Sequence, residues 1–557
     1  MERRALIAVA ISLFILIIYQ AVLLPLFYPG INQIAEPIPE SMPAGEPARA
    51  GGEPPPADAV PAPPPEVAAA PARQVVVETD QFIATLSSRG GRLESFALKK
   101  DRTTVDPDSP PQDLIVAGPN GEKPVAVELR ALEDSGDGQR RLAAVSDVNA
   151  AYAVRASSDR LTVAGEQSVD VELEWASPAG TIRKIYTFRG DRADFSLAVR
   201  GENLDPRYRE IGVSYLTGTM AGREKLFDRV AYLRERKLVE HYVDASELTE
   251  GEIVSGDPGW TWSGVGGTYF LAAMIPIEAG KPRLFLKQRD KLLEQKILFP
   301  ISGTSFDQQV SVYIGSKRVE TLQTVGHNLN LAVDMGWFSM IAELLLWLLR
   351  QSHKLTGNYG VDIILLTVLT KIAFLPLTRK SFESMRAMQK LQPQMTAIRE
   401  RLKDKPDEMN KEVMELYRRH GVNPLGGCLP MLVQIPVFIG LYQALLNAVE
   451  LRHAPFMLWI DDLSAPDRLG TLAIPFIDPP GIPVLTVVMG ATMFAQQWMT
   501  PSTGDPTQRQ MMMIMPLLFT FMFVSFPAGL VLYWTVNNIL TVAQQYYISH
   551  RAEKAAA

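Results

Sequence analysis

Cysteine is almost missing from this sequence, and this scarcity excludes several kinds of covalent link and metal site. Cys428 is the only cysteine among 557 residues, which excludes an intramolecular disulfide and any zinc or iron–sulfur site built from several cysteines. The six histidines are scattered, and no His-Glu-x-x-His pattern occurs. Lysine and arginine (55) are outnumbered by aspartate and glutamate (61), without the basic block typical of nucleic-acid binders. We therefore expect no metal, no cofactor and no nucleic-acid substrate.

Catalytic signatures are missing as well. The sequence contains no P-loop, no Gly-x-Ser-x-Gly elbow and no zinc-protease motif. The glycines of residues 264–267 do not fit a dinucleotide fingerprint and lie in a region with strand-like alternation, where a close backbone approach is the simpler explanation. These absences predict a protein that is not an enzyme.

Apolar residues are unevenly distributed, with long runs at the N-terminus and after residue 335 and a polar middle. The first run, within residues 1–28, is long enough to cross a bilayer of about 30 Å at about 1.5 Å per residue. A cleaved signal peptide is the alternative, but its apolar core would be shorter and followed closely by a small-residue cleavage site. We interpret this run as a transmembrane anchor, and Arg3 and Arg4 before it predict a cytoplasmic N-terminus.

The polar middle divides into a linker and a domain. Residues 29–74 are rich in Pro, Ala, Gly and Glu and lack the large apolar side chains of a core, so they are predicted to form a disordered tether. Residues 75–331 alternate between apolar and polar positions, as in 171–175 and 195–200, with turn signals between the runs. This pattern predicts one all-β domain of the sandwich class.

The rest of the chain, from residue 332 onward, is predicted to be a membrane-embedded helical region. Residues 332–356 are apolar but short and carry Glu343, so we expect an amphipathic helix lying in the membrane interface. Residues 357–550 contain five apolar segments, which with the N-terminal anchor predict six spans and place both termini on the same side. The expected segments are about 361–377, 429–449, 482–499, 511–526 and 530–548.

The placement of basic residues supports this topology. Residues 378–423 hold eleven Lys and Arg residues, whereas 450–481 hold only Arg452 and Arg468. By the positive-inside rule the first loop is cytoplasmic and the second is external, which also puts the β domain outside. Apolar residues recur at three- and four-residue spacing on both sides of residues 404–407, so 378–423 are predicted to form a helical hairpin. Residues 551–557 would be a short cytoplasmic tail.

Lys371 is the most informative single residue, because it lies in an otherwise apolar span about six residues before the cytoplasmic end. A lysine at mid-membrane costs about 2.5–3.5 kcal/mol on insertion scales. It either snorkels to the headgroups or stands in a hydrated cavity between helices. Polar residues in this segment and in other apolar segments favour the hydrated cavity, because together they could line it. For any one of them, an interhelical hydrogen bond is the commoner explanation. These residues are Thr367 on the same face, Gln434, Gln496, Gln497, and the stripe Trp534, Asn538, Thr541 and Gln545.

Several segments together resemble the YidC membrane insertases, relatives of the mitochondrial Oxa and chloroplast Albino proteins. The resemblance rests on Asn-Pro-Leu-Gly-Gly-Cys-Leu-Pro at 423–430, Gln-Ile-Pro-Val-Phe at 434–438 and Phe-Pro-Ala-Gly-Leu-Val-Leu-Tyr-Trp at 526–534. Pro-Leu-Thr at 376–378, Glu-Leu-Arg at 450–452 and Gly-Gly-Arg-Leu at 90–93 are also similar to family segments. The motifs occur in the family's order and cover essentially the whole chain.

The resemblance implies a Gram-negative inner-membrane protein with a periplasmic β-supersandwich and a five-helix insertase core. It implies insertion of nascent membrane proteins, alone or with the Sec translocon (SecYEG and its accessory proteins), through a hydrophilic groove open to cytoplasm and lipid. The ribosome is a further implied partner, but the short tail lacks the basic extension of some relatives. Lys371 takes the place of the family's usual groove arginine, which keeps the charge but loses bidentate carboxylate binding. Apolar client helices would slide past Met431, Ile435, Phe438 and Met515, although methionine in spans is more often simple core filling.

Two other functions compete with insertion. A membrane-anchored carbohydrate-binding or carbohydrate-modifying protein would use the β domain, with His241 as its main candidate residue, and would leave the hairpin and polar stripes unexplained. A small-molecule transporter would predict repeated halves, and no internal repeat is visible in the sequence.

Overall fold

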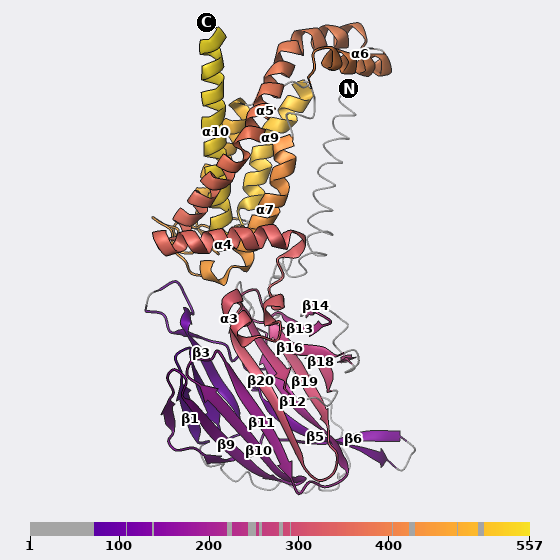
Figure 1. The fold of residues 1–557 in the computed structure, drawn as a ribbon, viewed down its shortest axis with the longest axis vertical. Helices are drawn as coiled ribbons and strands as arrows, with labels where there is room; N and C mark the ends of the chain where they lie inside the picture. Colours follow the sequence, from indigo (N-terminus) through magenta and orange to yellow (C-terminus); the bar gives the residue numbers. More distant parts are fainter. Residues whose placement is uncertain are drawn as a thin grey trace, which may run out of the picture.

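The structure, a computed structural model, describes residues 72–556 with short gaps. The gaps are 107, 136–138, 220–225, 243–251, 255–258, 278–281, 290, 404, 423–428, 476 and 500–505. The predicted anchor (1–28) and almost all of the predicted linker lie outside the described residues, as does the motif around Cys428. Figure 1 shows two bodies, a β domain and a helical bundle, with helix α4 lying across the end of the bundle that faces the β domain.

The strands follow the two-residue alternation expected from the sequence. In β10 (Gly180–Arg189) the inward positions carry Ile182, Tyr186 and Phe188, whereas Arg183 points outward and pairs with Glu174 at 2.8 Å. The other strands are β1 (Gln74–Glu78), β2 (Phe82–Ser87), β3 (Arg92–Arg102), β4 (Pro111–Asp113), β5 (Ala126–Ser135), β6 (Gln139–Ser146), β7 (Ala153–Arg155), β8 (Arg160–Thr162), β9 (Ser168–Ser177), β11 (Asp194–Glu202), β12 (Tyr208–Gly218), β13 (Arg229–Arg234), β14 (Lys237–Tyr242), β15 (Glu252–Val254), β16 (Trp260–Gly266), β17 (Phe270–Pro276), β18 (Arg283–Arg289), β19 (Leu292–Pro300) and β20 (Phe306–Ser316).

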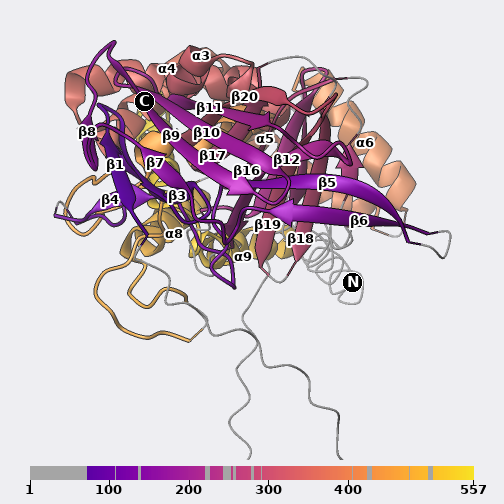
Figure 2. The same ribbon diagram turned by 90° about the horizontal axis from the view of Figure 1, so that it is seen from below.

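These strands form three sheets in the described part of the chain. Their orders are β4-β3-β2-β1-β8, β14-β13-β16-β17-β20-β11-β10-β9-β7 and β15-β18-β19-β12-β5-β6. Pairing is antiparallel except between β1 and β8. Seen from below in Figure 2, β5 and β6 reach out as a long hairpin while β9, β10 and β11 run side by side. One extended apolar core fills the space between the sheets, with stacked rings such as Phe82 and Phe96 at its centre.

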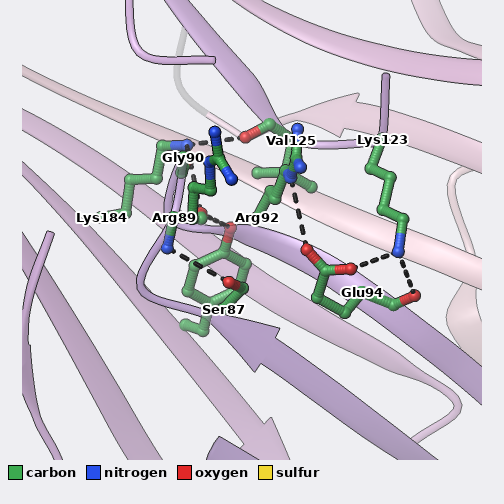
Figure 3. Close-up of polar contacts among 10 residues, drawn as sticks. Ser87, Arg89, Gly90, Arg92, Glu94, Lys123, Val125 and Lys184 are labelled. Carbon is green, nitrogen blue, oxygen red and sulfur yellow. Dashed lines mark hydrogen bonds and ion pairs between the residues drawn. The ribbon is translucent and has the colours of Figure 1, made fainter. Parts of the chain in front are cut away.

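A buried lysine interrupts the apolar face of β10. Lys184 is fully buried, and its ammonium lies 2.5 Å from the carboxylate of the equally buried Asp147. The same nitrogen donates to the carbonyl oxygens of Gly90 (2.9 Å), Gly91 (3.1 Å) and Val125 (2.6 Å), as Figure 3 shows for Gly90 and Val125. Burial lowers the pKa of Lys184 while the Asp147 charge opposes that shift.

This polar cluster explains the Gly-Gly-Arg-Leu segment. Gly90 and Gly91 both have positive φ (71° and 54°), a conformation that costs other L-residues roughly 1–2 kcal/mol. A Cβ on Gly91 would stand 3.0 Å from the Tyr152 ring, so the turn has no room for a side chain. The turn aims its carbonyls at the lysine, and beyond it Glu94 pairs with Lys123 and with Arg92 (Figure 3).

A second buried lysine predicts a pH dependence. Desolvation lowers the pKa of Lys317 from 10.5 to about 8, with the Arg229 charge adding to the shift. The folded state therefore loses this proton at lower pH than the unfolded state, so stability should rise between pH 8 and 10.5 by on the order of 3 kcal/mol. We expect Lys317→Met to be more stable than wild type at pH 7.5, with the gap shrinking by pH 9.5. Urea unfolding of the full chain in detergent measures this, and an unchanged gap at the two pH values would refute it.

The helical region contains seven longer helices in the described residues. They are α4 (Ser339–Thr356), α5 (Tyr359–Arg401), α6 (Pro406–Arg419), α7 (Leu429–Asn447), α8 (Val484–Met499), α9 (Pro506–Phe523) and α10 (Ala528–Ala556) when the hairpin arm α6 is included with the others. Short elements α3 (Val319–Val325), η3 (Leu329–Ala332), η4 (Gly336–Phe338) and η6 (Val449–Leu451) connect them to one another and to the β domain. The α6 end of the bundle lies far from the β domain (Figure 1).

The structure differs from the sequence prediction at two helix ends. We expected a span at 361–377 followed by a separate hairpin helix, but α5 is one continuous helix of 43 residues. Hydropathy changes near Thr378 whereas the backbone hydrogen bonding continues, so the polarity boundary is not a helix end. Likewise, α10 continues through the predicted tail to Ala556. The turn before α6 lies where it was predicted, with Pro406 at the first helical turn.

Among the described residues, only α5 is both long and apolar enough to cross a membrane by itself, and α7 and α9 contain shorter apolar stretches. The six predicted spans are therefore not established by helix length and composition. The apolar face of α5 nevertheless leaves large side chains uncovered by protein, namely Leu365, Leu369, Ile372 and Leu375.

Helix α4 has two unlike apolar faces. Ala342, Leu345 and Leu349 are buried against the bundle, and Ile341 packs so near Gly440 of α7 that a Cβ there would stand 2.9 Å from it. The opposite side exposes Met340, Leu344 and Trp347, with Trp337 just before the helix. Exposed apolar groups in this arrangement are typical of a helix lying on a membrane surface.

Candidate functional site: a polar cluster in the helical bundle

The centre of the candidate site is a hydrogen bond between two helices. Lys371 of α5 is half-buried, and its ammonium donates to the hydroxyl of Thr541 on α10 at 2.7 Å. That hydroxyl donates in turn to the carbonyl of Asn537 at 2.6 Å. None of the ion pairs among the described residues involves Lys371. The site therefore holds a cation that pairs with none of the described carboxylates of the bundle.

A second link joins α7 to the same part of α10. The side-chain amide of Gln434 donates to Asn537 Oδ1 at 3.1 Å. Asn537 thus accepts at its side chain from Gln434 and at its carbonyl from Thr541. Helix α7 is thus bonded directly to Asn537, and helix α5 is linked to it through Thr541.

The rest of the stripe on α10 faces α8. Asn538 donates to Thr492 Oγ1 at 3.2 Å, and Gln545 donates to the carbonyl of Met499 at 2.6 Å. Both side chains are buried. These residues bind two helices together, which is the commoner role of polar groups between spans. The stripe on α10 therefore has two parts. One part packs against α8, and the other part lies near Lys371 and Gln434.

Trp534, which the sequence analysis predicted in the groove, is half-buried and packs in an aromatic cluster. Its ring meets Phe438 edge-on at 4.8 Å between centroids and lies 5.2 Å from Phe523 and 6.2 Å from Phe519. The cluster borders the polar residues one turn away on α10. Trp534 thus contributes packing between α7, α9 and α10.

Two further predicted residues stand apart from the cluster. Thr367 is fully buried, and its hydroxyl donates to the carbonyl of Ile363 in its own helix at 2.6 Å, so it does not line an open groove. Thr367 shares a helical face with Lys371, yet Thr367 is fully buried whereas Lys371 is half-buried. Gln497 is half-buried near the end of α8.

The predicted client-contact residues are partly exposed where the structure describes them. Ile435 on α7 and Met515 on α9 are 43% and 40% exposed. Phe438 is half-buried against Trp534. The side chain of Met431 lies outside the described residues.

Sequence reasoning missed Asn537 and Thr492, which hold the site together. Asn537 falls off the regular i, i+4, i+7 stripe, and Thr492 is a lone hydroxyl in an apolar segment, so neither carries a pattern. Within the described residues, no group of three or more His, Cys, Asp or Glu is placed to hold a metal ion. The cluster can hydrogen-bond, attract anionic groups and hold water, which is physical rather than covalent chemistry.

The amino-acid sequence matches known proteins along its whole length. The chain is 39% identical to the "Membrane protein insertase YidC" of Syntrophobacter fumaroxidans, over 99% of this chain and all of that one. It is 40% identical to the protein of the same name in Citrifermentans bemidjiense, over 99% of both chains. The chain belongs to the YidC family of membrane protein insertases. Family profiles described as "YidC periplasmic domain" and "60Kd inner membrane protein" match residues 74–348 and 351–555.

The two YidC profiles divide the chain as the fold does. The first covers the strands β1–β20 together with most of α4, and the second covers α5–α10. Lys371, Gln434 and Asn537 all fall within the second. The sequence-based assignment to the YidC insertases is thereby confirmed, and so is the presence of a β-rich periplasmic domain.

A comparison with solved structures matches an active YidC insertase, at 19% identity and a TM-score of 0.37, covering 85% of this chain and 92% of that one. A putative aldose 1-epimerase from Escherichia coli covers 44% of this chain and 99% of its own, at 11% identity and a TM-score of 0.29. Scores this low add nothing to the assignment, which rests on the sequence relatives.

Proposed function

We propose that this chain inserts integral membrane proteins and helps them fold, through the cluster around Lys371. The observation that carries the proposal is the Lys371 cation, which is held between α5 and α10 and has no carboxylate partner in the part of the bundle that the structure describes. Relatives of the whole chain are named insertases. Insertion requires a polar client segment to cross a slab where unsatisfied polar groups cost several kcal/mol each. A cation and hydrogen-bonding side chains part of the way across lower that cost.

In the proposed mechanism the polar client segment enters beside Lys371 and Gln434, while its apolar helix moves along α7 and α9. The exposed side chains of Ile435 and Met515 and the edge of Phe438 provide that path. Partitioning of the client drives the process, because Leu, Ile, Phe and Val contribute about −0.3 to −0.6 kcal/mol each. The membrane potential assists acidic segments by about 2.3 kcal/mol per charge per 100 mV.

The proposed topology has six spans, with the N-terminal anchor, α5, α7, α8, α9 and α10 crossing the bacterial inner membrane. The hairpin of α5 and α6 and both termini are cytoplasmic, and the β domain, a supersandwich, is periplasmic. Basic residues support this, since the exposed Arg379, Arg401 and Arg419 lie in the hairpin. Nascent membrane proteins, the Sec translocon and the ribosome are the proposed partners.

A carbohydrate function for the β domain is the weaker candidate. Its only structural support is the likeness to sugar-converting enzymes at TM-scores near 0.3, which carries no argument. His241 lies on β14 beside Tyr232, with the rings stacked at 6.2 Å, and is part of the packing of that hairpin.

Photocrosslinking tests the proposed client path. A photoreactive residue at Ile435 or Met515 should crosslink to a stalled single-span client during insertion. The same residue at Ile539 is the matched control, because Ile539 is similarly exposed (49%) but lies on α10 outside the proposed path. Equal crosslinking at all three positions would mean that the client has no preferred path and would overturn the proposal.

A further inference from the structure

A polar cavity of about 280 Å³ lies at the junction between the β domain and the helical bundle. Its walls come from the end of β3 and the loop after it, from Arg318 before α3, from the start of α5 at Tyr359, and from residues 449–453 after α7. In Figure 1 the loop after β3 rises toward the bundle just below α4. The cavity shares no lining residue with the Lys371 cluster, although Tyr359 and Lys371 lie on the same helix, α5.

Contacts between the two bodies hold the walls in place. Arg452, which is 9% exposed, donates to the carbonyl of Arg102 at 2.7 Å and to Gln112 Oε1 at 3.1 Å. Its guanidinium also lies 5.2 Å from the centre of the Phe270 ring. The cavity is therefore framed by residues fixed by both bodies and does not depend on exposed side chains alone.

The charges around the cavity are mixed and incompletely paired. Its lining carries four cations and three carboxylates, namely Lys100, Arg102, Arg318, Arg452, Asp101, Asp106 and Glu450. Arg318 binds Asp101 at 3.2 Å through one terminal nitrogen, yet its Nε is buried and without a hydrogen-bond partner in the described part of the chain. Glu450 binds Arg350 at 2.9 Å, yet its Oε2 is also buried and, by the same criterion, unpartnered.

A buried donor or acceptor without a hydrogen-bond partner costs about 1–3 kcal/mol of folding stability. A ligand that formed hydrogen bonds to both groups would recover this cost and would therefore bind favourably. Such a ligand needs an anionic acceptor for Arg318 and a cationic donor for Glu450. Tyr359 opens α5, the apolar helix long enough to cross a membrane, and α4 beside it exposes Trp347 and Leu344. In the topology proposed above, on which this inference rests, the cavity would lie at the level of the lipid headgroups of the outer leaflet.

We propose that this cavity binds the phosphoethanolamine headgroup of a phospholipid, with the phosphate at Arg318 and the ammonium at Glu450. Phosphatidylcholine has the same phosphate, but its quaternary ammonium cannot donate a hydrogen bond. Phosphatidylglycerol lacks the ammonium altogether. The site would therefore prefer the ethanolamine lipid, and the bound lipid would tie the β domain to the membrane surface.

Native mass spectrometry of the full chain in detergent, titrated with each of the three lipids, measures this preference. We expect the ethanolamine lipid to bind about tenfold better than the choline lipid, as for a hydrogen bond to a charged group. Glu450→Gln should abolish the preference. Glu320→Gln is the matched control, because Glu320 pairs with the same Arg350 but is exposed and does not line the cavity.

A second variant distinguishes the contribution of the phosphate from that of the ammonium group. It also provides a control for misfolding, because its charge is unchanged. Arg318→Lys keeps the charge but loses the Nε donor, so it should weaken ethanolamine and choline lipids alike without changing their ratio. Equal binding of both lipids to wild type, or a preserved preference in Glu450→Gln, would overturn the proposal. Displacement of the lipid by inorganic phosphate as readily as by glycerophosphoethanolamine would reduce the cavity to a simple anion site and would also overturn it.

Discussion

Replacing Lys371 with alanine should slow insertion of a short single-span client by about tenfold or more. The reason is that a hydrogen bond to a charged group is worth about 1.5–3 kcal/mol, and each 1.4 kcal/mol in a barrier is about tenfold in rate. The polar client segment would lose that contact part of the way across the membrane. Purified chain in vesicles, with protease protection of the client as readout, measures the rate.

The slower insertion by Lys371→Ala should result from the lost charge and not from a less stable helical bundle. Thr541 would still donate to the carbonyl of Asn537, so Lys371→Ala should unfold thermally at the wild-type temperature. Lys371→Arg keeps the charge and should insert at nearly the wild-type rate. Normal insertion by Lys371→Ala would remove the lysine from the mechanism, although it would leave the family assignment untouched.

Replacing Lys184 with methionine should destabilise the β domain by about 3–5 kcal/mol. This is the usual cost of breaking a buried ion pair, because the remaining charge stays buried without its partner. In this domain Asp147 would be left unpaired, and the carbonyls of Gly90, Gly91 and Val125 would lose their shared donor. Urea unfolding of the full chain, followed by near-ultraviolet circular dichroism, measures the change.

Lys123→Met provides the control for this variant. Lys123 pairs with Glu94 in the same region, but its side chain is 22% exposed whereas that of Lys184 is fully buried, so its loss should cost clearly less than the loss of Lys184. The double variant Lys184→Met with Asp147→Asn should recover part of the stability, because it removes the unpaired charge. Equal costs for Lys184→Met and Lys123→Met would show that the buried pair does not hold the domain together.

The sequence was informative where a pattern repeats along one element. Alternation predicted the β domain, and three- and four-residue spacing predicted the helices around residues 404–407. The stripe of Asn538, Thr541 and Gln545 was visible because one helix carries it. Its partners were not, since Asn537 and Thr492 belong to no pattern and are defined only by how α7, α8 and α10 pack together.

Other features were hidden because they depend on contacts between distant segments. Lys184 occupies an inward position that alternation would assign to an apolar residue, and only its neighbours in space explain it. Trp534 falls on the polar stripe by spacing, yet its ring packs among Phe438, Phe519 and Phe523. The cavity beside Arg318 and Glu450 is formed by four separate segments of the chain, around residues 100–106, 318, 359 and 449–453, so no local signal could reveal it.

The central claim is that polar and apolar parts of a client follow different surfaces of the bundle. The most direct test extends the crosslinking from Ile435 and Met515 by adding a probe at Thr541 and using a client stalled during insertion. The apolar helix of the client should crosslink to positions 435 and 515, and its polar segment should crosslink to position 541. If both segments reached the same positions, or if the polar segment never reached position 541, the role given to the Lys371 cluster would be contradicted.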